Sequence, residues 1–264
     1  MKKLVIAFAI CLAVTSCFNR QKTKKTEEPV KTEAELMAEA VVKIQLDSIA
    51  TEIGKLQPVG LVECIKNGEV ILTDSEKAVK PDYLADPAYA KDLQTLAQKY
   101  RAVAILGVDA EVAKLYDMPT ADYDAALKKL YADINDPAIK AFNDCPTLQV
   151  AIERCYDTAK ENGREYFFWE AATAALIEQA YIASRNIDKF IVAFNDKSAS
   201  DFSYNVILLT DAIDKLASIN EEYKQLNESL KPLYKINAIN LDEFRTQLES
   251  VKDEIVPARQ ALMQ

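Results

Sequence analysis

Helix start and stop signals recur along the chain from Asp86 onward, and they constrain the fold more than any other feature of the sequence. Aspartate or threonine precedes successive apolar-periodic segments, and proline follows at the first position of two of them, as is typical of helix N-termini. The loops between these segments are short, so successive helices are expected to pack as antiparallel neighbours. The sequence therefore predicts an all-α fold, a multi-helix antiparallel bundle.

The same signals predict the ends of individual helices. We expect Gly107 to end the helix that Asp86 starts, and Asp109 to cap a short helix before Pro119. Pro257 is expected to kink the last helix or to begin a loose end. The other segments expected to be helical in this part of the chain are 120–134, 136–144, 187–195, 199–219, 221–230 and 241–261.

The segment that Gly163 opens, REYFFWEAATAALIEQAYIASR, is apolar on all sides of its helical axis. A helix without a broad polar face is buried, so we predict that residues 164–185 form the central helix. Nearer the N-terminus, an apolar seam from Val42 to Leu56 repeats at spacings of three and four residues, which predicts a helix over 32–57. That helix packs along the bundle or, alternatively, pairs with a second copy as a coiled coil.

One segment departs from the helical pattern. Asn67-Gly68 lies between two runs rich in β-formers, in the stretch VGLVECIKNGEVILTD, and these two residue types readily adopt the positive φ angles of a type I′ turn. We therefore predict one small β-hairpin at about 60–73, which caps the core or, alternatively, offers an edge to a partner. The side chains expected to face the helices are Leu61, Ile65, Val70 and Leu72.

Glu170 and Glu178 interrupt the predicted central helix and are the candidate buried carboxylates. Their spacing places them about 80° apart around the helix and roughly 12 Å apart along it. Burial raises the pKa of a carboxyl group, so such a pair could act as general acid and base. The alternative is structural, with each glutamate bonded to a Lys, Arg or Tyr of an adjacent helix or reaching solvent. A dimetal carboxylate site is not expected, because that type also uses histidine and the chain has none.

Tyr116, Tyr123 and Tyr131 recur at intervals of seven and eight residues, roughly on one face of successive helices. Aromatic faces bind sugars, lipids or peptides, and tyrosine is favoured at recognition surfaces. These residues are the candidate ligand surface. The alternative is that the bundle buries each ring and leaves its hydroxyl hydrated.

The absence of histidine is the sharpest chemical exclusion in the sequence. It removes Ser-His-Asp and Cys-His nucleophile pairs and ordinary His-ligated zinc or haem sites. The formal net charge of −9 disfavours contact with phosphate backbones, so no nucleic-acid partner is expected. We expect no catalytic residue, no cofactor and no metal site.

The N-terminal segment KKLVIAFAICLAVTSC carries a targeting signal. Two lysines precede an apolar run of about eleven residues, which is shorter than the roughly twenty of a membrane span and typical of a secretory signal peptide. The run ends in VTSC, residues 14–17. These four residues resemble the lipobox of bacterial lipoproteins, and the chain resembles helical lipoproteins of the Bacteroidetes. The resemblance implies cleavage after Ser16, a diacylglyceryl group on the Cys17 sulfur and acylation, such as palmitate, of the new amino terminus.

This resemblance divides the chain into a signal peptide at 1–16, a lipidated cysteine with a flexible tether at 17–33, and a single helical domain at 34–264. The tether is predicted because that stretch is highly charged and has few large apolar residues. Basic residues follow Cys17 where some surface lipoproteins of the Bacteroidetes carry an acidic export run. We therefore expect a membrane partner through Cys17 and a location on the outer membrane, facing the periplasm.

Three cysteines besides Cys17 belong to the mature chain: Cys64, Cys145 and Cys155. The last two lie up to roughly 15 Å apart along one predicted helix, farther than the 7 Å or so that a disulfide spans. A disulfide would therefore join Cys64 to one of them or link two chains; alternatively, all three are small buried hydrophobes. Ser48 and Thr158 lie in Asp-Ser-Ile and Asp-Thr-Ala triplets that resemble the periplasmic O-glycosylation pattern of the Bacteroidetes.

These patterns predict a lipid-anchored, non-catalytic binding or scaffold module of the cell envelope, with an envelope protein or glycan as partner. One alternative is a small-molecule or glycan receptor with a Tyr-lined groove. Another is an enzyme that uses Glu170 and Glu178, which requires those carboxylates to converge in a cleft.

Overall fold

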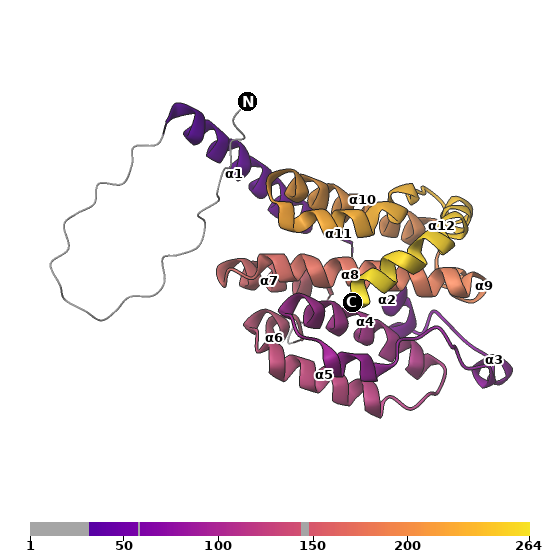
Figure 1. Cartoon of the computed structure of the whole chain (residues 1–264). Helices are drawn as coiled ribbons and strands as arrows, with labels where there is room; N and C mark the ends of the chain where they lie inside the picture. Colours follow the sequence, from indigo (N-terminus) through magenta and orange to yellow (C-terminus); the bar gives the residue numbers. More distant parts are fainter. Residues whose placement is uncertain (1–31, 58, 144–147) are drawn as a thin grey trace. The chain divides into compact units, whose positions relative to one another are not determined.

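The computed structural model describes residues 32–57, 59–143 and 148–264 (Figure 1). The described residues form helices and loops and contain no strand, which confirms the all-α prediction. Residues 41–264 form one compact unit. The compact unit thus begins inside the first helix, a few residues after the predicted boundary at 34.

The α-helices are α1 (Glu33–Ile53), α2 (Leu61–Lys66), α3 (Asp74–Ala78), α4 (Leu96–Leu115), α5 (Ala121–Ile134), α6 (Pro137–Asn143), α7 (Leu148–Glu161), α8 (Glu165–Arg185), α9 (Ile187–Phe190), α10 (Asp196–Ile219), α11 (Lys224–Leu230) and α12 (Leu241–Met263). Short 3-10 helices are η1 (Pro87–Asp92), η2 (Ile191–Ala193), η3 (Glu221–Tyr223) and η4 (Lys231–Lys235). Capping boxes at Thr95 and Asn195 start α4 and α10, because these side chains satisfy backbone N–H groups of the first turn.

Helix α8 is the central helix of residues 41–264, as its all-round apolar sequence predicts. Trp169, Ile177 and Ile182 are at most 1% exposed. Figure 1 shows α8 between α10 and α11 on one side and α4 on the other, with α5 beyond α4. The C-terminal half of α12 crosses α8 and ends near the middle of the unit in this view.

Helix α4 both begins and ends later in the chain than predicted. It runs through Gly107 and Asp109 to Leu115, so the predicted stop at Gly107 and the predicted cap at Asp109 are wrong. The true start is Thr95, because η1 ends at Asp92 and a short extended stretch follows. Packing along α8 stabilises the continuous helix and outweighs the cost of about 1 kcal/mol for a glycine in a helix interior.

The predicted β-hairpin is wrong, because Leu61–Lys66 form the short helix α2. Gly68 has the positive φ, +73°, that the predicted turn required. Asn67 does not, since its φ of −77° and ψ of −5° are right-handed helical. A type I′ turn requires positive φ at both residues.

Gly68 serves instead as the residue that ends α2. The Glu69 N–H donates to the Cys64 carbonyl over 2.9 Å, and the Gly68 N–H donates to the Ile65 carbonyl over 3.0 Å. These two bonds form a Schellman motif, which ends a helix with a left-handed glycine. The predicted inward side chains remain inward even so, with three buried and one half-buried: Leu61, Val70, Leu72 and Ile65.

Two further predictions concern the ends of the domain. Helix α12 continues past Pro257 to Met263, and Arg259 and Leu262 beyond the proline are buried, so no loose end begins there. In α1, the predicted seam is confirmed at Ile49 and Ile53, which are 0% and 4% exposed.

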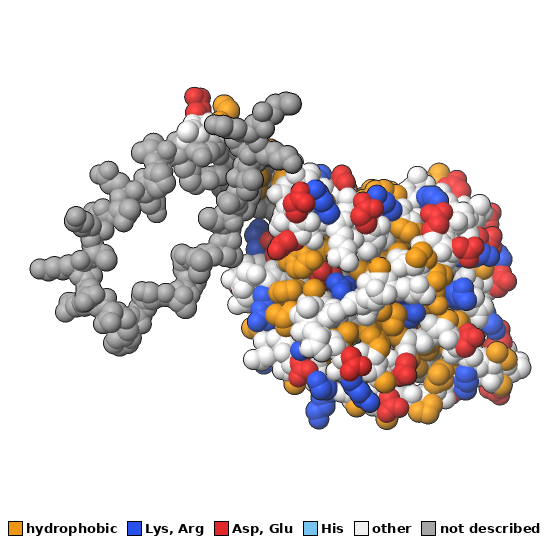
Figure 2. Space-filling model, in the orientation of Figure 1, with side chains coloured by type: hydrophobic (Ala, Val, Ile, Leu, Met, Phe, Trp, Pro, Cys, Tyr) orange, Lys and Arg blue, Asp and Glu red, His pale blue; other side chains and the backbone are white. Residues whose placement is uncertain are grey.

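On the face of residues 41–264 that Figure 2 shows, basic and acidic side chains are interspersed, with apolar atoms between them.

Candidate functional site

Glu170 and Glu178 lie on α8 and are 1% and 0% exposed. The structure therefore buries both candidate carboxylates. Each contacts an arginine of another helix, Arg101 of α4 for Glu170 and Arg259 of α12 for Glu178. The structural alternative, in which each glutamate bonds a cation of an adjacent helix, describes the observed contacts.

The Glu178 ion pair is bidentate. Arg259 Nε donates to Glu178 Oε2 over 2.6 Å, and Arg259 Nη2 donates to Oε1 over 2.8 Å. The same guanidinium lies over the ring of Tyr181, 4.3 Å from its centroid. The planar guanidinium of arginine is suited to this arrangement, because it can form two parallel hydrogen bonds with a carboxylate and stack on an aromatic ring at the same time.

A third buried group, Asp109 of α4, joins this pair. Asp109 is 0% exposed, and its Oδ2 accepts a 2.8 Å hydrogen bond from the Ala85 N–H. The distance from Asp109 Oδ2 to Arg259 Nη2 is 3.7 Å, so one guanidinium faces two carboxyl groups. We call these three residues, Asp109, Glu178 and Arg259, the buried triad.

Both carboxyl groups of the buried triad have raised pKa values. Burial, and next the nearby Glu178 carboxylate, raise the pKa of Asp109 well above its usual value. Burial also raises the pKa of Glu178, but its hydrogen bonds with Arg259 oppose that shift. Of the two carboxyl groups, Asp109 is therefore the one whose protonated form the site favours, because two like charges in a low-dielectric interior disfavour ionisation of both.

The sequence did not reveal Asp109 as part of this cluster, because it looked like a helix cap after Gly107. A usable signal was present, since Leu106 and Val112, three residues to either side, are apolar and lie on the same face of a continuous helix. Both are 0% exposed. The local glycine concealed that pattern.

The Glu170 ion pair is closer to the surface. Arg101 Nη1 donates to Glu170 Oε2 over 2.9 Å, and Arg101 Nε donates to the Leu262 carbonyl over 2.7 Å. Arg101 is 9% exposed. The pair thereby connects the first turns of α4 and α8 to the last turns of α12.

These contacts remove the geometric basis for acid and base roles of Glu170 and Glu178. Each carboxylate is held by its own guanidinium on a different pair of helices, and the two do not converge on one cleft. Within residues 32–57, 59–143 and 148–264, no group of three or more Cys, Asp or Glu side chains is placed to hold a metal ion.

The three candidate tyrosines do not form an exposed surface. Tyr116 and Tyr123 are 2% and 6% exposed. The Tyr116 hydroxyl accepts from Asn186 Nδ2 over 3.2 Å, and the Tyr123 hydroxyl donates to the Ala85 carbonyl over 3.0 Å. Tyr131 is half-buried. Tyr116 and Tyr123 belong to the hydrophobic core, so these tyrosines do not line an exposed groove.

The Arg101–Glu170 pair lines a polar hollow of about 420 Å³. It is bounded by the first turns of α4 and α8, by α11 and by the last turns of α12. We use the name polar hollow for the space lined by the polar side chains of Thr95, Gln98, Arg101, Tyr166, Glu170 and Gln225 and by neighbouring residues of α4 and α12.

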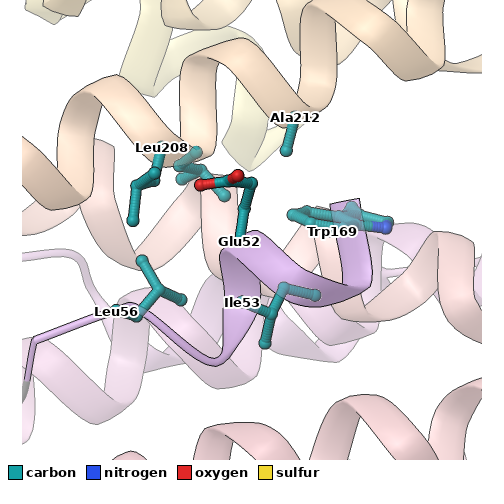
Figure 3. Close-up of a pocket in the computed structure, with 7 residues that line it drawn as sticks. Glu52, Ile53, Leu56, Trp169, Leu208 and Ala212 are labelled. Atoms are coloured by element: carbon teal, nitrogen blue, oxygen red, sulfur yellow. The ribbon is translucent and has the colours of Figure 1, made fainter. Parts of the chain in front are cut away.

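A second, apolar gap lies between α1, α8 and α10 (Figure 3). Figure 3 shows the Glu52 carboxylate pointing toward Leu208, and the indole nitrogen of Trp169 pointing away from Glu52. The space is only about 10 Å³, and Glu52 forms an ion pair with Lys55 at 3.0 Å. This gap is therefore a packing defect of the core and not a ligand site.

The remaining predicted positions are as follows. The Cys64 thiol is free and buried, with Sγ 3.9 Å from the Ala193 carbonyl, and burial raises the pKa of this thiol to about 12. Ser48 and Thr158 are half-buried on α1 and α7. The lipobox with Cys17, most of the predicted tether, and Cys145 lie outside the described residues.

Comparison with known proteins places the chain in no family. No protein-family model matches it, and no curated protein and no solved structure is significantly similar to it. Of the helices in the part of the chain that the structure describes, none has the length and apolarity needed to span a membrane.

Proposed function

We propose that this protein is a bacterial lipoprotein, anchored through Cys17 on the periplasmic side of the outer membrane, whose helical domain is a non-catalytic binding or scaffold module. The observation that carries the anchor is the VTSC motif at residues 14–17, placed after two lysines and a short apolar run. Two or more acyl chains on Cys17 give stable membrane attachment.

The contacts of the helical domain support a binding role over catalysis. The buried carboxylates proposed for acid and base chemistry are each held by an arginine, which is a role in packing. The polar hollow, by contrast, is a concave and partly unfilled site. It supports the glycan-receptor alternative without any contribution from Tyr116, Tyr123 or Tyr131. An envelope protein or a glycan therefore remains the proposed partner.

Lipidation is tested by labelling cells that express the chain with an alkyne analogue of palmitate and by measuring the mass of the mature protein. The expected result is a labelled protein in the membrane fraction, and loss of label and of cleavage in Cys17→Ser. Cys11→Ser is the matched control, because Cys11 lies in the apolar run that is removed, so labelling and mature mass stay unchanged. Equal labelling of Cys17→Ser and the parent chain would refute the anchor.

The partner is tested by crosslinking in cells followed by mass spectrometry. A reproducible envelope protein crosslinked to residues of α1–α12 supports a scaffold. Recovery of the chain alone, at crosslinker concentrations that capture known envelope complexes, argues against a protein partner and leaves the glycan alternative.

A further inference from the structure

We infer that the polar hollow is a binding site for a neutral saccharide of about disaccharide size. The inference rests on the binding-module part of the proposed function and not on the lipid anchor. It is drawn from the Arg101–Glu170 pair, from the groups around it and from the size of the space.

The base of the polar hollow has unused hydrogen-bonding capacity. An arginine carries five N–H donors. Among the described residues, Arg101 donates one to the Leu262 carbonyl and one to Glu170 Oε2, so three remain for a ligand. Glu170 adds a carboxylate acceptor, which also interacts with the Tyr166 hydroxyl. Residues Arg101 and Glu170 are 9% and 1% exposed, and their positions are fixed by the ion pair, so these groups are preorganised.

The sides of the polar hollow add both donors and acceptors. Thr95 Oγ1 accepts from the Gln98 N–H over 3.2 Å, which leaves its hydroxyl hydrogen free to donate. The Gln225 side chain is exposed and has no hydrogen-bond partner among the described residues. Tyr166 is half-buried, with its hydroxyl 3.5 Å from the Glu222 carbonyl. Residues with hydroxyl and amide groups therefore line one space.

Two alanines keep this space open. Ala97 of α4 is half-buried, and Ala261 of α12 is exposed, and both line the polar hollow. The volume of about 420 Å³ is within the range of about 300–1,000 Å³ for small-molecule sites. A larger side chain at Ala261 would occupy part of this space.

The charge of the site selects a neutral ligand. Arg101 and Glu170 form a net-neutral pair at 2.9 Å. A carboxylate or an ammonium group would have to separate them to obtain a full ionic partner, and breaking a buried pair is costly. A sugar hydroxyl can accept from Arg101 and donate to Glu170 at the same time while the pair stays intact.

The test uses the full chain, purified in a detergent without a sugar head group. Saturation-transfer NMR screens N,N′-diacetylchitobiose, cellobiose and maltose, with glycine and glutamate as charged comparison ligands, and calorimetry measures Kd. We expect at least one neutral disaccharide to bind at millimolar Kd or tighter. Ala261→Trp should weaken that binding at least tenfold, and Ala125→Trp, an exposed alanine on α5, should change it less than twofold.

A second variant keeps the result interpretable if Ala261→Trp disturbs α12. Gln225→Ala removes one exposed amide and should weaken binding about 2- to 10-fold, the value of one hydrogen bond. Absence of binding by every neutral disaccharide, binding of the charged ligands alone, or equal binding by Ala261→Trp and Ala125→Trp would each overturn the inference. None of these outcomes alters the mass of the mature chain, so a failure here is distinct from a failure of the Cys17 anchor.

Discussion

Replacement of Asp109 by asparagine is expected to stabilise the protein at neutral pH. The Asp109 side chain is 0% exposed, and it faces Glu178 while sharing a single guanidinium with it. Burial and the Glu178 carboxylate raise the pKa of Asp109 well above its usual value, so the folded protein holds a proton on this carboxyl to higher pH than the unfolded chain does.

The sign of the pH dependence follows from this difference. Below the pKa of Asp109 in the unfolded chain, 3.8, this carboxyl is protonated in both the folded and the unfolded protein. Its contribution to the free energy of unfolding is then fully present. As the pH rises toward the folded-state pKa, only the unfolded chain releases the proton. The free energy of unfolding then falls by about 1.4 kcal/mol for each pH unit, and the loss is complete above the folded-state pKa.

Asparagine has the same shape as the protonated carboxyl and does not titrate. Its amide nitrogen can donate to Glu178, and its oxygen can accept from the Ala85 N–H that now bonds Asp109 at 2.8 Å. The difference in unfolding free energy between Asp109→Asn and the parent chain should therefore grow by about 1.4 kcal/mol per pH unit above pH 4, up to the folded-state pKa.

The assay is guanidinium chloride unfolding followed by circular dichroism at pH 4, 5, 6 and 7 and constant ionic strength. Asp211→Asn is the control, because Asp211 pairs with Lys215 at the surface at 2.5 Å, and such pairs contribute about 0–1 kcal/mol. A difference that stays flat from pH 4 to 7, or an Asp109→Asn protein that is less stable than the parent at pH 7, would contradict a raised pKa of Asp109 in the folded protein.

The other predictions use the same unfolding assay. Arg101→Met leaves Glu170 buried without its cation and should cost about 3–5 kcal/mol, and adding Glu170→Met should recover most of that loss. Gly107→Ala should stabilise by about 0.5–1 kcal/mol, because a Cβ there meets no atom within 4 Å inside α4. Gly68→Ala should instead destabilise by about 1 kcal/mol, since its φ is +73° although its Cβ is equally unobstructed. Asn195→Ala removes the capping box of α10 and should cost about 1 kcal/mol. A destabilising Gly107→Ala or a stabilising Gly68→Ala would contradict the backbone conformations assigned to these two glycines.

Several features of this protein were determined by the sequence alone. The all-round apolar segment from Arg164 to Arg185 had to be buried, and α8 is central. The caps and short loops determined the all-α class and the approximate ends of α5, α6, α10 and α11. These properties are local, because periodicity and capping depend on residues within one or two turns of each other.

Other features were decided by the tertiary structure. A positive φ at Gly68 satisfies both a hairpin turn and a helix end, and the packing of α2 against α4 and α8 selected the helix. In the sequence, Gly107 resembles a helix end and Asp109 resembles a helix N-cap. Packing against α8 nevertheless stabilises α4 as one continuous helix and places Asp109 in the core.

The candidate site shows most clearly which features the sequence determined and which the tertiary structure decided. Sequence identified Glu170 and Glu178 as buried carboxylates, but their partners lie 69 and 81 residues away along the chain. No local pattern specifies which arginine meets which glutamate, because that choice follows from how α4 and α12 cross α8. The polar hollow likewise exists only where four helices end near one another, so its chemistry is a property of the packed bundle.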